Sequence, residues 1–138
     1  RNIVEIGCGL GIVSNLIAKG LENSIVSGVD ISRTAVSKAK IKYPNILFYE
    51  GDISNIKFKS DKRYDVVILN EMLWYILNNM DQAISNVSKM MVDDGYLIIS
   101  MAFLKNQQYG KDIINGYSGL LDFCKSKMAS EFEIIFHD

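Results

Sequence analysis

Short apolar runs, rich in β-branched and aromatic residues, alternate along this chain with segments of helical periodicity. Runs of this composition, bounded by glycine, asparagine, aspartate or serine, are typical of β-strands. We predict strands at residues 2–6, 24–29, 46–50, 64–70, 95–100 and 132–136. Several runs are apolar at successive positions, which indicates parallel strands covered by helices on both faces. The pattern therefore predicts an α/β fold with three layers, Rossmann-like and doubly wound, around a mainly parallel sheet.

Helices are predicted in the segments between these strands. One helix should begin near Gly11, directly after the first strand. Another should follow Ser32 as its N-cap and end by about Lys42, because Pro44 disfavours helical backbone in the residue before it. Apolar residues at helical spacing predict two more helices. They comprise Ile84, Val87 and Met91, in a helix that starts near Met80, and then Leu120, Leu121, Cys124 and Met128.

Composition bounds the kind of protein. The chain has 138 residues, is 49% hydrophobic and carries a formal net charge of -1, so we expect one globular domain spanning residues 1–138. This charge balance gives no electrostatic basis for binding nucleic acid or an anionic membrane, and no apolar run reaches the roughly 18 to 20 residues of a membrane span. Cys8 and Cys124 form neither a metal motif nor a disulfide framework. We therefore expect a cytoplasmic protein with a small-molecule partner and no metal.

The stretch VEIGCGLG places three glycines on alternate positions after the first predicted strand. Glycine allows a tight turn and lets a ligand approach bare backbone, and the helix that follows offers free N–H groups. The spacing differs from the dinucleotide fingerprint GxGxxG, because Ile12 stands where that motif requires glycine or alanine. No GK[ST] follows, so the P-loop pattern is absent as well. The turn therefore predicts a nucleotide-type site in which phosphate chemistry is disfavoured.

Carboxylates stand at four predicted strand ends, at Glu5, Asp30, Asp52 and Glu71. No lysine or arginine falls between residues 2 and 18, so the mouth of the site is expected to be acidic. Such a mouth repels a pyrophosphate and favours a ligand with a positive centre. S-adenosylmethionine carries a sulfonium and an ammonium and no phosphate, so this ligand suits the site.

In these motifs and their order the chain resembles a class I S-adenosylmethionine-dependent methyltransferase from Ile3 to about Ser100. VEIGCGLG is similar to the family's first motif, and GVDIS, YEGDIS and YDVVILNEMLWYI are similar to the ends of its second, third and fourth strands. The resemblance implies that the glycine loop passes under the methionine part of the cofactor. It also implies that Asp30 holds both ribose hydroxyls and that Asp52 accepts from the adenine amino group, with Ile53 beside the ring.

The predicted site has a cofactor part and a catalytic part. For the cofactor we predict Glu5, Gly7, Cys8, Gly9, Gly11, Asp30, Ile31, Asp52, Ile53 and Asn70. Glu71 is the first candidate for a general base, because it directly follows the fourth strand, and Tyr75, Tyr109 and His137 are the others. A base is needed only where the acceptor keeps its proton at neutral pH, since alignment with an activated methyl group supplies most of the acceleration.

The segment after the fourth strand narrows the acceptor. NEMLWY contains no proline, so it lacks the N/D-P-P-Y/F segment common in enzymes that methylate base amines or protein glutamine. It also lacks the Pro-Cys nucleophile of cytosine C5 enzymes. We therefore predict methyl transfer to a small-molecule acceptor by in-line displacement. LNEMLWYIL and QQYGKDI resemble segments of nodulation-type N-methyltransferases, which act on sugar amines.

The chain departs from the family pattern at both ends. It starts at the first strand and ends just after FEIIF, so we expect a trimmed core that lacks the family's N-terminal cap and last strand. The bare sheet edge left by that strand favours association, for example as a homodimer. Two other functions stay open. One is a non-catalytic module that binds S-adenosylmethionine, and the other is an NAD-dependent oxidoreductase, which Ile12 and the acidic mouth disfavour.

Overall fold

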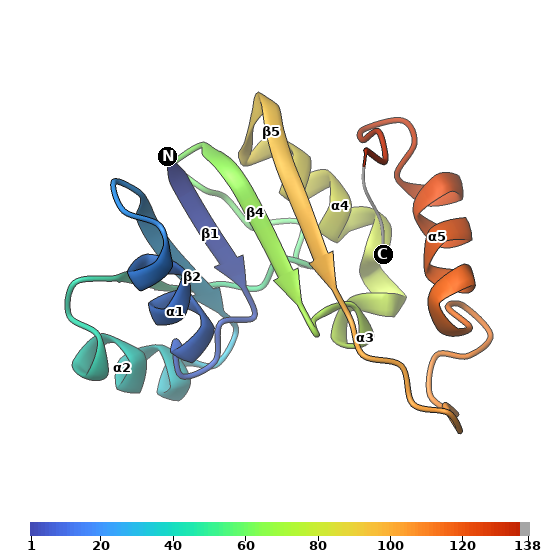
Figure 1. Cartoon of the computed structure of the whole chain (residues 1–138), viewed down its shortest axis with the longest axis horizontal. Coiled ribbons are helices and arrows are strands. Elements are labelled where there is room, and N and C mark those ends of the chain that lie inside the picture. Colours follow the sequence, from blue (N-terminus) through green and yellow to red (C-terminus); the bar gives the residue numbers. More distant parts are fainter. Residues whose placement is uncertain (136–138) are drawn as a thin grey trace.

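The computed structural model describes residues 1–135 of the chain. Within these residues five strands form one sheet in the order β3-β2-β1-β4-β5, and all neighbouring strands are parallel (Figure 1). The strands are β1 (Asn2–Ile6), β2 (Ile25–Asp30), β3 (Leu47–Glu50), β4 (Tyr64–Asn70) and β5 (Met91–Ser100). The chain runs from β1 outward to β3 and then returns to the other side of β1 for β4 and β5. The predicted doubly wound sheet is thus confirmed.

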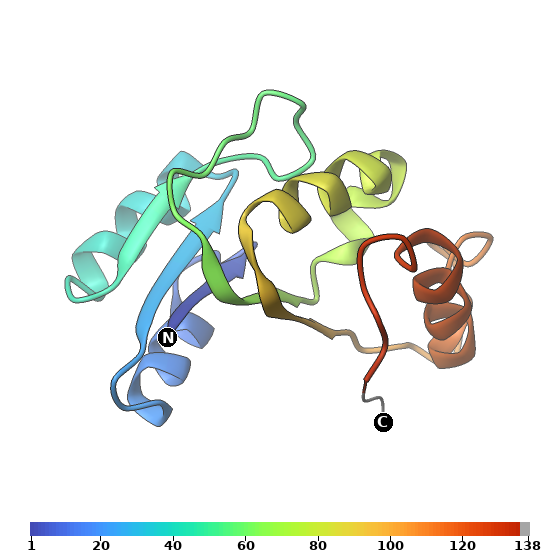
Figure 2. The same cartoon turned by 90° about the horizontal axis from the view of Figure 1, so that it is seen from above.

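Helices cover both faces of this sheet, as the apolar runs predicted. Figure 2 shows α1 and α4 on opposite faces, which gives three layers. The helices are α1 (Ile12–Gly20), α2 (Arg33–Lys42), α3 (Leu73–Ile76), α4 (Met80–Lys89) and α5 (Gly116–Lys127), with the 3-10 turn η1 (Leu77–Asn79) before α4. Among the described residues, no helix has the length and apolar character needed to cross a membrane.

The alternation of side chains along the strands divides the core in two. Val4 of β1 and Val67 of β4 are fully buried in a large cluster that also contains Ala83 and Val87 of α4. On the opposite face Phe48 of β3 belongs to a smaller cluster with residues of α2. The two clusters enclose β1 and β2 from both sides, so the carboxyl ends of these strands are held in fixed positions relative to the helices.

Local signals set the bounds of α2 as predicted. Ser32 is the N-cap, and its hydroxyl oxygen accepts a hydrogen bond from the backbone N–H of Ala35 at 3.2 Å. The helix ends at Lys42, two residues before Pro44. The predicted helix start after the glycine stretch is confirmed too, because Gly11 is the N-cap of α1.

The predicted sixth strand is wrong over the residues that the structure describes. Residues 132–135 have no regular secondary structure, and Phe136 and His137 lie outside the described residues. The backbone N–H of Phe132 donates to the carbonyl of Met128 at 2.8 Å, in a turn that continues from the end of α5. The apolar and β-branched composition of this run therefore does not bring it into the sheet, since its first N–H is already used by a local turn.

Met91 was also predicted on the wrong element. The helix that begins at Met80 ends at Lys89, and Met91 is the first residue of β5, where it pairs with Tyr64. The register then shifts, so that Val66 is the next β4 residue to pair. This irregularity lets β5 begin before the predicted run at 95–100, because the residues between absorb the change in register.

Candidate functional site

The strand order changes direction between β1 and β4, because the chain runs outward from β1 to β3 and then returns to the other side of β1. In open parallel sheets, ligands bind outside the carboxyl ends of the strands at such a point. The glycine loop at residues 7–11 follows β1, Asp30 ends β2 and Asn70 ends β4. The fold therefore brings these predicted cofactor residues to one edge of the sheet.

The glycine loop owes its shape to backbone conformations that other residues rarely adopt. Gly7, Gly9 and Gly11 have φ of 77°, 51° and 75°, all in the left-handed region. The loop is joined to β2 by the N–H of Gly7, which donates to the carbonyl of Val29 at 2.7 Å. A Cβ on Gly7 would lie 2.8 Å from Cγ of Met72, so the loop also packs closely against the segment after β4.

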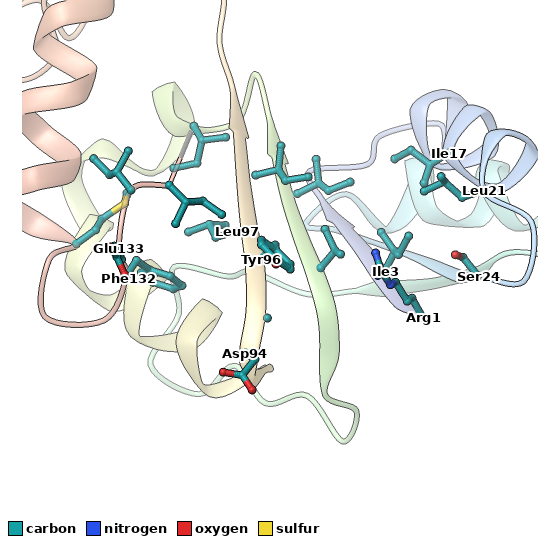
Figure 3. A pocket seen from close by; sticks show the side chains of 18 of the residues that line it. Arg1, Ile3, Ile17, Leu21, Ser24, Asp94, Tyr96, Leu97, Phe132 and Glu133 are labelled. Atoms are coloured by element: carbon teal, nitrogen blue, oxygen red, sulfur yellow. The ribbon is translucent and has the colours of Figure 1, made fainter. Parts of the chain in front are cut away.

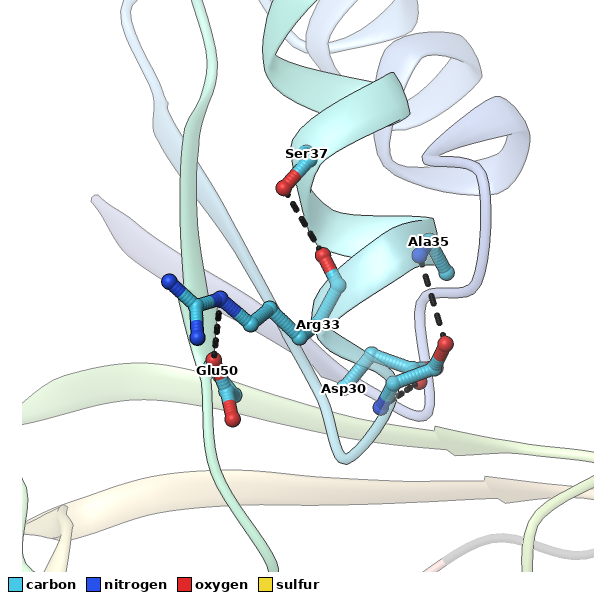
Figure 4. Close-up of polar contacts among 6 residues, drawn as sticks. Asp30, Arg33, Ala35, Ser37 and Glu50 are labelled. Carbon is cyan, nitrogen blue, oxygen red and sulfur yellow. Dashed lines mark hydrogen bonds and ion pairs between the residues drawn. The ribbon is translucent and has the colours of Figure 1, made fainter.

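Asp30 connects this loop to the start of α2. One carboxylate oxygen accepts from the N–H of Gly9 and the other from the N–H of Ser32, both at 2.8 Å. A carboxylate offers about four acceptor sites, so further acceptor capacity remains for a ligand. Figure 4 shows Arg33, at the start of α2, turned toward Glu50 of β3, with its Nε 4.0 Å from a carboxylate oxygen. The carboxylate of Asp30 is thus available to a ligand at the predicted cofactor site.

Glu5 lies beneath the loop and not at its surface. It is 3% exposed, and its carboxylate accepts a 2.5 Å hydrogen bond from the hydroxyl of Ser14, which is fully buried in the first turn of α1. Burial raises the pKa of the Glu5 carboxyl, and the hydrogen bond from Ser14 opposes that rise. This pair ties the end of β1 to α1 on either side of the glycine loop, so Glu5 supports the loop from below.

Cys8 has a packing role in this structure. Its side chain is buried with Val36 and Phe48, in the smaller cluster beside α2. Burial raises the pKa of the Cys8 thiol to about 12, and the nearby carboxylates of Asp30 and Glu5 add to the rise. A reactive thiolate at the helix start is therefore disfavoured, and the side chain packs in the smaller core cluster.

The turn after β3 carries Asp52 at the same edge. One of its carboxylate oxygens accepts from the N–H of Ser54 at 2.9 Å and from the hydroxyl of Ser54 at 2.6 Å. The two apolar residues predicted to flank the adenine ring, Ile31 and Ile53, differ in exposure. Ile31 is 68% exposed, whereas Ile53 is 2% exposed and belongs to the large core cluster. The expected place of Ile53 beside an adenine ring is thus corrected, and Ile31 is the exposed apolar side chain.

The residues after β4 include two of the four catalytic candidates, Glu71 and Tyr75; Tyr109 lies after β5 and is 66% exposed, and His137 lies outside the described residues. Glu71 has a φ of 53°, a strained conformation for a residue other than glycine, and its N–H donates to the carbonyl of Ser100 at 2.8 Å. Tyr75 on α3 is 86% exposed. Asn70 is half-buried at the end of β4. Glu71 therefore stands exposed at the predicted site, held there by the pairing between β4 and β5.

Three residues of this region were missed at the level of sequence. Ser14 hydrogen-bonds Glu5, Met72 packs on Gly7, and Asn86 of α4 hydrogen-bonds the turn after β3. A signal for Asn86 was present, because an amide next to Val87 interrupts the apolar face of a predicted helix. Ser14 and Met72 show no such signal, since their roles depend on neighbours that only the fold brings together.

A separate hollow of about 1650 Å³ lies across the other part of the sheet (Figure 3). It spans the sheet face between α1 and α5, and its lining includes Ile3, Ile17, Tyr96 and Phe132. Among the described residues, none of those predicted for the cofactor lines it. The candidate site at the carboxyl ends of the strands is therefore separate from this hollow.

Fold and site together define a class of protein. A 3-2-1-4-5 parallel sheet with a glycine turn and carboxylates at its switch point is typical of doubly wound α/β proteins that bind nucleoside-containing ligands. Residues 1–129 match the family described as "Methyltransferase domain". The chain therefore belongs to this family, and its fold is that of the class I S-adenosylmethionine-dependent methyltransferases, as the motifs indicated.

Curated relatives are longer than the chain. It is 31% identical over 105 residues to a putative methyltransferase, 235L, of Invertebrate iridescent virus 6, in a match that covers 76% of the chain and 38% of the relative. It is 30% identical over 100 residues to the malonyl-[acyl-carrier protein] O-methyltransferase of Bacillus cereus, covering 71% of the chain and 36% of that protein. The chain thus spans little more than a third of either relative.

Solved structures agree on the fold. A TehB-like methyltransferase from Corynebacterium glutamicum matches with a TM-score of 0.69 and 19% identity, over 90% of the chain and 63% of that structure. The amino pentose methyltransferase CalS10 from Micromonospora echinaspora, solved with S-adenosylmethionine bound, matches with a TM-score of 0.67 and 18% identity, over 85% of the chain and 47% of that structure. At this identity the likeness concerns the fold alone.

Proposed function

We propose that the protein that contains this chain transfers a methyl group from S-adenosylmethionine to a small-molecule acceptor by in-line displacement. The observation that carries the proposal is the setting of Asp30. Its carboxylate is oriented by the N–H groups of Gly9 and Ser32 at the switch point, and the nearby Arg33 pairs with Glu50 instead. An acidic site of this kind favours a cationic ligand and disfavours a pyrophosphate.

The chain's own residues bind and orient the ligand in this proposal. Asp30 accepts from the two ribose hydroxyls, Asp52 accepts from the adenine amino group, and Ile31 provides an apolar wall. The glycine loop brings backbone close to the methionine part, and Glu5 with Ser14 keeps the loop in place from below. S-adenosylmethionine itself supplies an activated methyl group on its sulfonium. Alignment then provides most of the acceleration.

Proton removal is assigned to the residues after β4. Glu71 is exposed at the predicted site, so its carboxylate is free to accept a proton from an acceptor amine or hydroxyl. Tyr75 is the second candidate, on the exposed side of α3. An acceptor that is already ionised, such as a carboxylate, needs no base, and in that case changing Glu71 to glutamine leaves the rate almost unchanged.

Three observations support a small-molecule acceptor. The segment after β4 has no N/D-P-P-Y/F motif and no Pro-Cys pair. Several relatives are named malonyl-[acyl-carrier protein] O-methyltransferases, and two similar structures are those of an amino pentose methyltransferase and a sugar N-methyltransferase. The chain itself has a formal net charge of only -1, which offers no basis for binding nucleic acid.

Localisation and oligomeric state are also part of the proposal. Cys8 and Cys124 are free thiols, which fits a reducing cytoplasm. Among the described residues, β5 pairs with β4 alone, so its other edge is open to a second copy of the chain, and we propose a homodimer.

Binding and transfer are tested in that order. Titration calorimetry should show that S-adenosylmethionine and S-adenosylhomocysteine bind in the micromolar range and that NAD does not. Incubation with methyl-labelled S-adenosylmethionine and a panel of small carboxylates and amines should then label one class of acceptor. Binding without transfer to any acceptor favours the non-catalytic module, and binding of NAD in place of both sulfur ligands overturns the proposal.

A further inference from the structure

Asn86 is a buried polar residue on an apolar helix face. It lies on α4, is 4% exposed, and is followed by Val87, which is fully buried in the large core cluster. An amide at such a position loses its contacts with water, so it destabilises the fold unless protein groups replace them. The contacts of this amide therefore indicate what the position is for.

The amide group of Asn86 is directed at one distant segment. Its Nδ2 donates to the carbonyl of Ile53 and to the carbonyl of Asn55, both at 2.8 Å. Its Oδ1 accepts from Nε2 of Gln82, one helical turn earlier, at 3.1 Å. A side-chain amide has two N–H donors, and here both are used on the turn after β3.

That turn is a compact unit which begins at Asp52. The N–H of Asn55 donates to the carbonyl of Asp52 at 3.0 Å, and Ser54 donates twice to the Asp52 carboxylate. The side chain of Ile53 is buried in the core from the same turn. The turn is thus attached to the body of the protein by an apolar contact at Ile53 and by the two hydrogen bonds from Asn86. The first contact resists withdrawal of the turn, and the second sets its direction, because hydrogen bonds depend on angle.

We propose that Asn86 is a positioning residue that acts through the turn at 52–55 and thereby sets the selectivity of the site for an adenine base. This inference rests on the proposed function, in which Asp52 accepts from the adenine amino group. A carboxylate fixed at that position favours a base with an amino group and disfavours a base with a carbonyl there, since two acceptors repel. Asn86 touches neither ligand nor reacting atoms, and its effect reaches the ligand only through the position of Asp52.

The test is a double-mutant cycle read with two ligands. S-adenosylhomocysteine carries the amino group, and its deaminated analogue, S-inosylhomocysteine, carries a carbonyl in its place. Asp52→Ala, Asn86→Ala and the double variant are titrated with both, beside wild type. Gln82→Ala is the matched control, because it removes the outer partner of Asn86 and leaves both bonds to the turn.

We expect Asn86→Ala to lower the selectivity of the site, and we expect its effect not to add to that of Asp52→Ala. Asn86→Ala should lower the preference for the amino ligand by at least about fivefold, and the double variant should bind it no more weakly than Asp52→Ala does. Gln82→Ala should keep the wild-type preference. A general loss of stability would weaken both ligands alike, so the ratio of the two affinities separates positioning from a merely structural role.

Failure of the inference and failure of the proposed function give different results. If Asp52→Ala leaves both affinities unchanged, the role given to Asp52 is overturned, and this inference falls with it. If Asp52→Ala abolishes the preference while Asn86→Ala keeps it, or if the two losses add in full, Asn86 is not a positioning residue and the proposed function stands. Should Asn86→Ala not fold, Asn86→Ser is measured in its place, and unfolding of both variants also overturns the inference.

Discussion

At the scale of single residues, the site depends on a few side chains and backbone angles that the fold holds in place. Asp30 is a residue whose position could be predicted from the sequence. It was expected as an acid at the end of the second strand, and its hydrogen bonds in the structure fit that position. Ile53 is the opposite case. It was predicted as a wall for the ligand, yet its side chain is buried in the core. The hydrogen bonds that turn this segment inward come from Asn86, 33 residues away along the chain for the bond at Ile53. The sequence shows a polar residue that interrupts the apolar face of a predicted helix, but it does not show which segment that residue contacts.

The glycine loop gives the first prediction. Gly7→Ala should destabilise the protein more than Gly9→Ala, because both have positive φ but only the Cβ at Gly7 would overlap Met72. For Gly9→Ala we expect a loss of about 1 to 2 kcal/mol in the free energy of unfolding, from backbone strain alone. Gly20→Ala is the control, since Gly20 meets nothing within 4 Å and has no positive φ. Urea unfolding measures all three, and equal losses at Gly7 and Gly9 would contradict the contact with Met72.

The buried pair at Glu5 and Ser14 gives a dependence on pH. The pKa of Glu5 is raised above its ordinary value of 4.5 in the folded state, so the stability linked to its protonation is present below that value and is lost as pH rises through the folded pKa. Glu5→Gln stays neutral at every pH. Measured as a difference from wild type, the free energy of unfolding of Glu5→Gln should therefore increase between pH 4 and pH 7, because only the wild type loses stability over this range.

Ser14→Ala should show the reverse of this trend. The Ser14 hydroxyl stabilises the ionised carboxylate, so its removal should destabilise the protein more at pH 7 than at pH 4. Urea unfolding across this range measures both variants. Differences from wild type that stay constant with pH would show that Glu5 does not titrate in the way its burial implies.

At the scale of elements, the periodicity of the sequence predicted β1 and β4 at their observed bounds, β2 and β3 to within one residue at their ends, and β5 only from Gly95 onward. Such runs are readable because a parallel strand covered on both faces needs apolar residues at every position. Two features of the fold could not be predicted from composition and periodicity. The run at 132–135 has the composition of a strand, but a turn after α5 uses its first N–H. The early start of β5 depends on a shift in its register against β4, which composition does not encode.

The N-cap of α2 provides a prediction at this scale. Ser32→Ala removes the hydrogen bond from Ala35 to the Ser32 hydroxyl and should lower the free energy of unfolding by about 1 kcal/mol. Ser37→Ala in the same helix is the matched control. Its hydroxyl donates to the carbonyl of Arg33, which already lies within the helix, so a change of under about 0.5 kcal/mol is expected. Thermal unfolding compares the two, and an equal effect at both positions would contradict the capping role.

At the scale of the whole molecule, the part of one sheet face between α1 and α5 stays uncovered among the described residues. The hollow between α1 and α5 exposes Tyr96 and Ile98 of β5, which are 53% and 47% exposed, next to the open edge of that strand. Apolar surface of this kind commonly marks an interaction site. The predicted ligand site lies at the carboxyl ends of the strands, so association through the hollow would leave that site accessible.

Self-association through this face is therefore expected for residues 1–138. Sedimentation should show a dimer whose dissociation constant rises at least about tenfold in Ile98→Lys, because a charge on the apolar face resists burial. Ile41→Lys is the control, since Ile41 on α2 is exposed and does not line the hollow. A wild-type monomer at high concentration, or equal weakening by both variants, would contradict association at this face.

The central claim is that Asp30 makes the carboxyl ends of the strands a site for S-adenosylmethionine. Titration calorimetry with S-adenosylhomocysteine on wild type, Asp30→Asn and Arg33→Ala tests it most directly. Asp30→Asn keeps the shape and one acceptor oxygen but removes the charge, and it should weaken binding by at least about 1.5 kcal/mol through the loss of charge-assisted hydrogen bonds. Arg33→Ala, which removes a neighbouring side chain paired with Glu50, should bind as wild type does. Equal affinity in wild type and Asp30→Asn would contradict the claim.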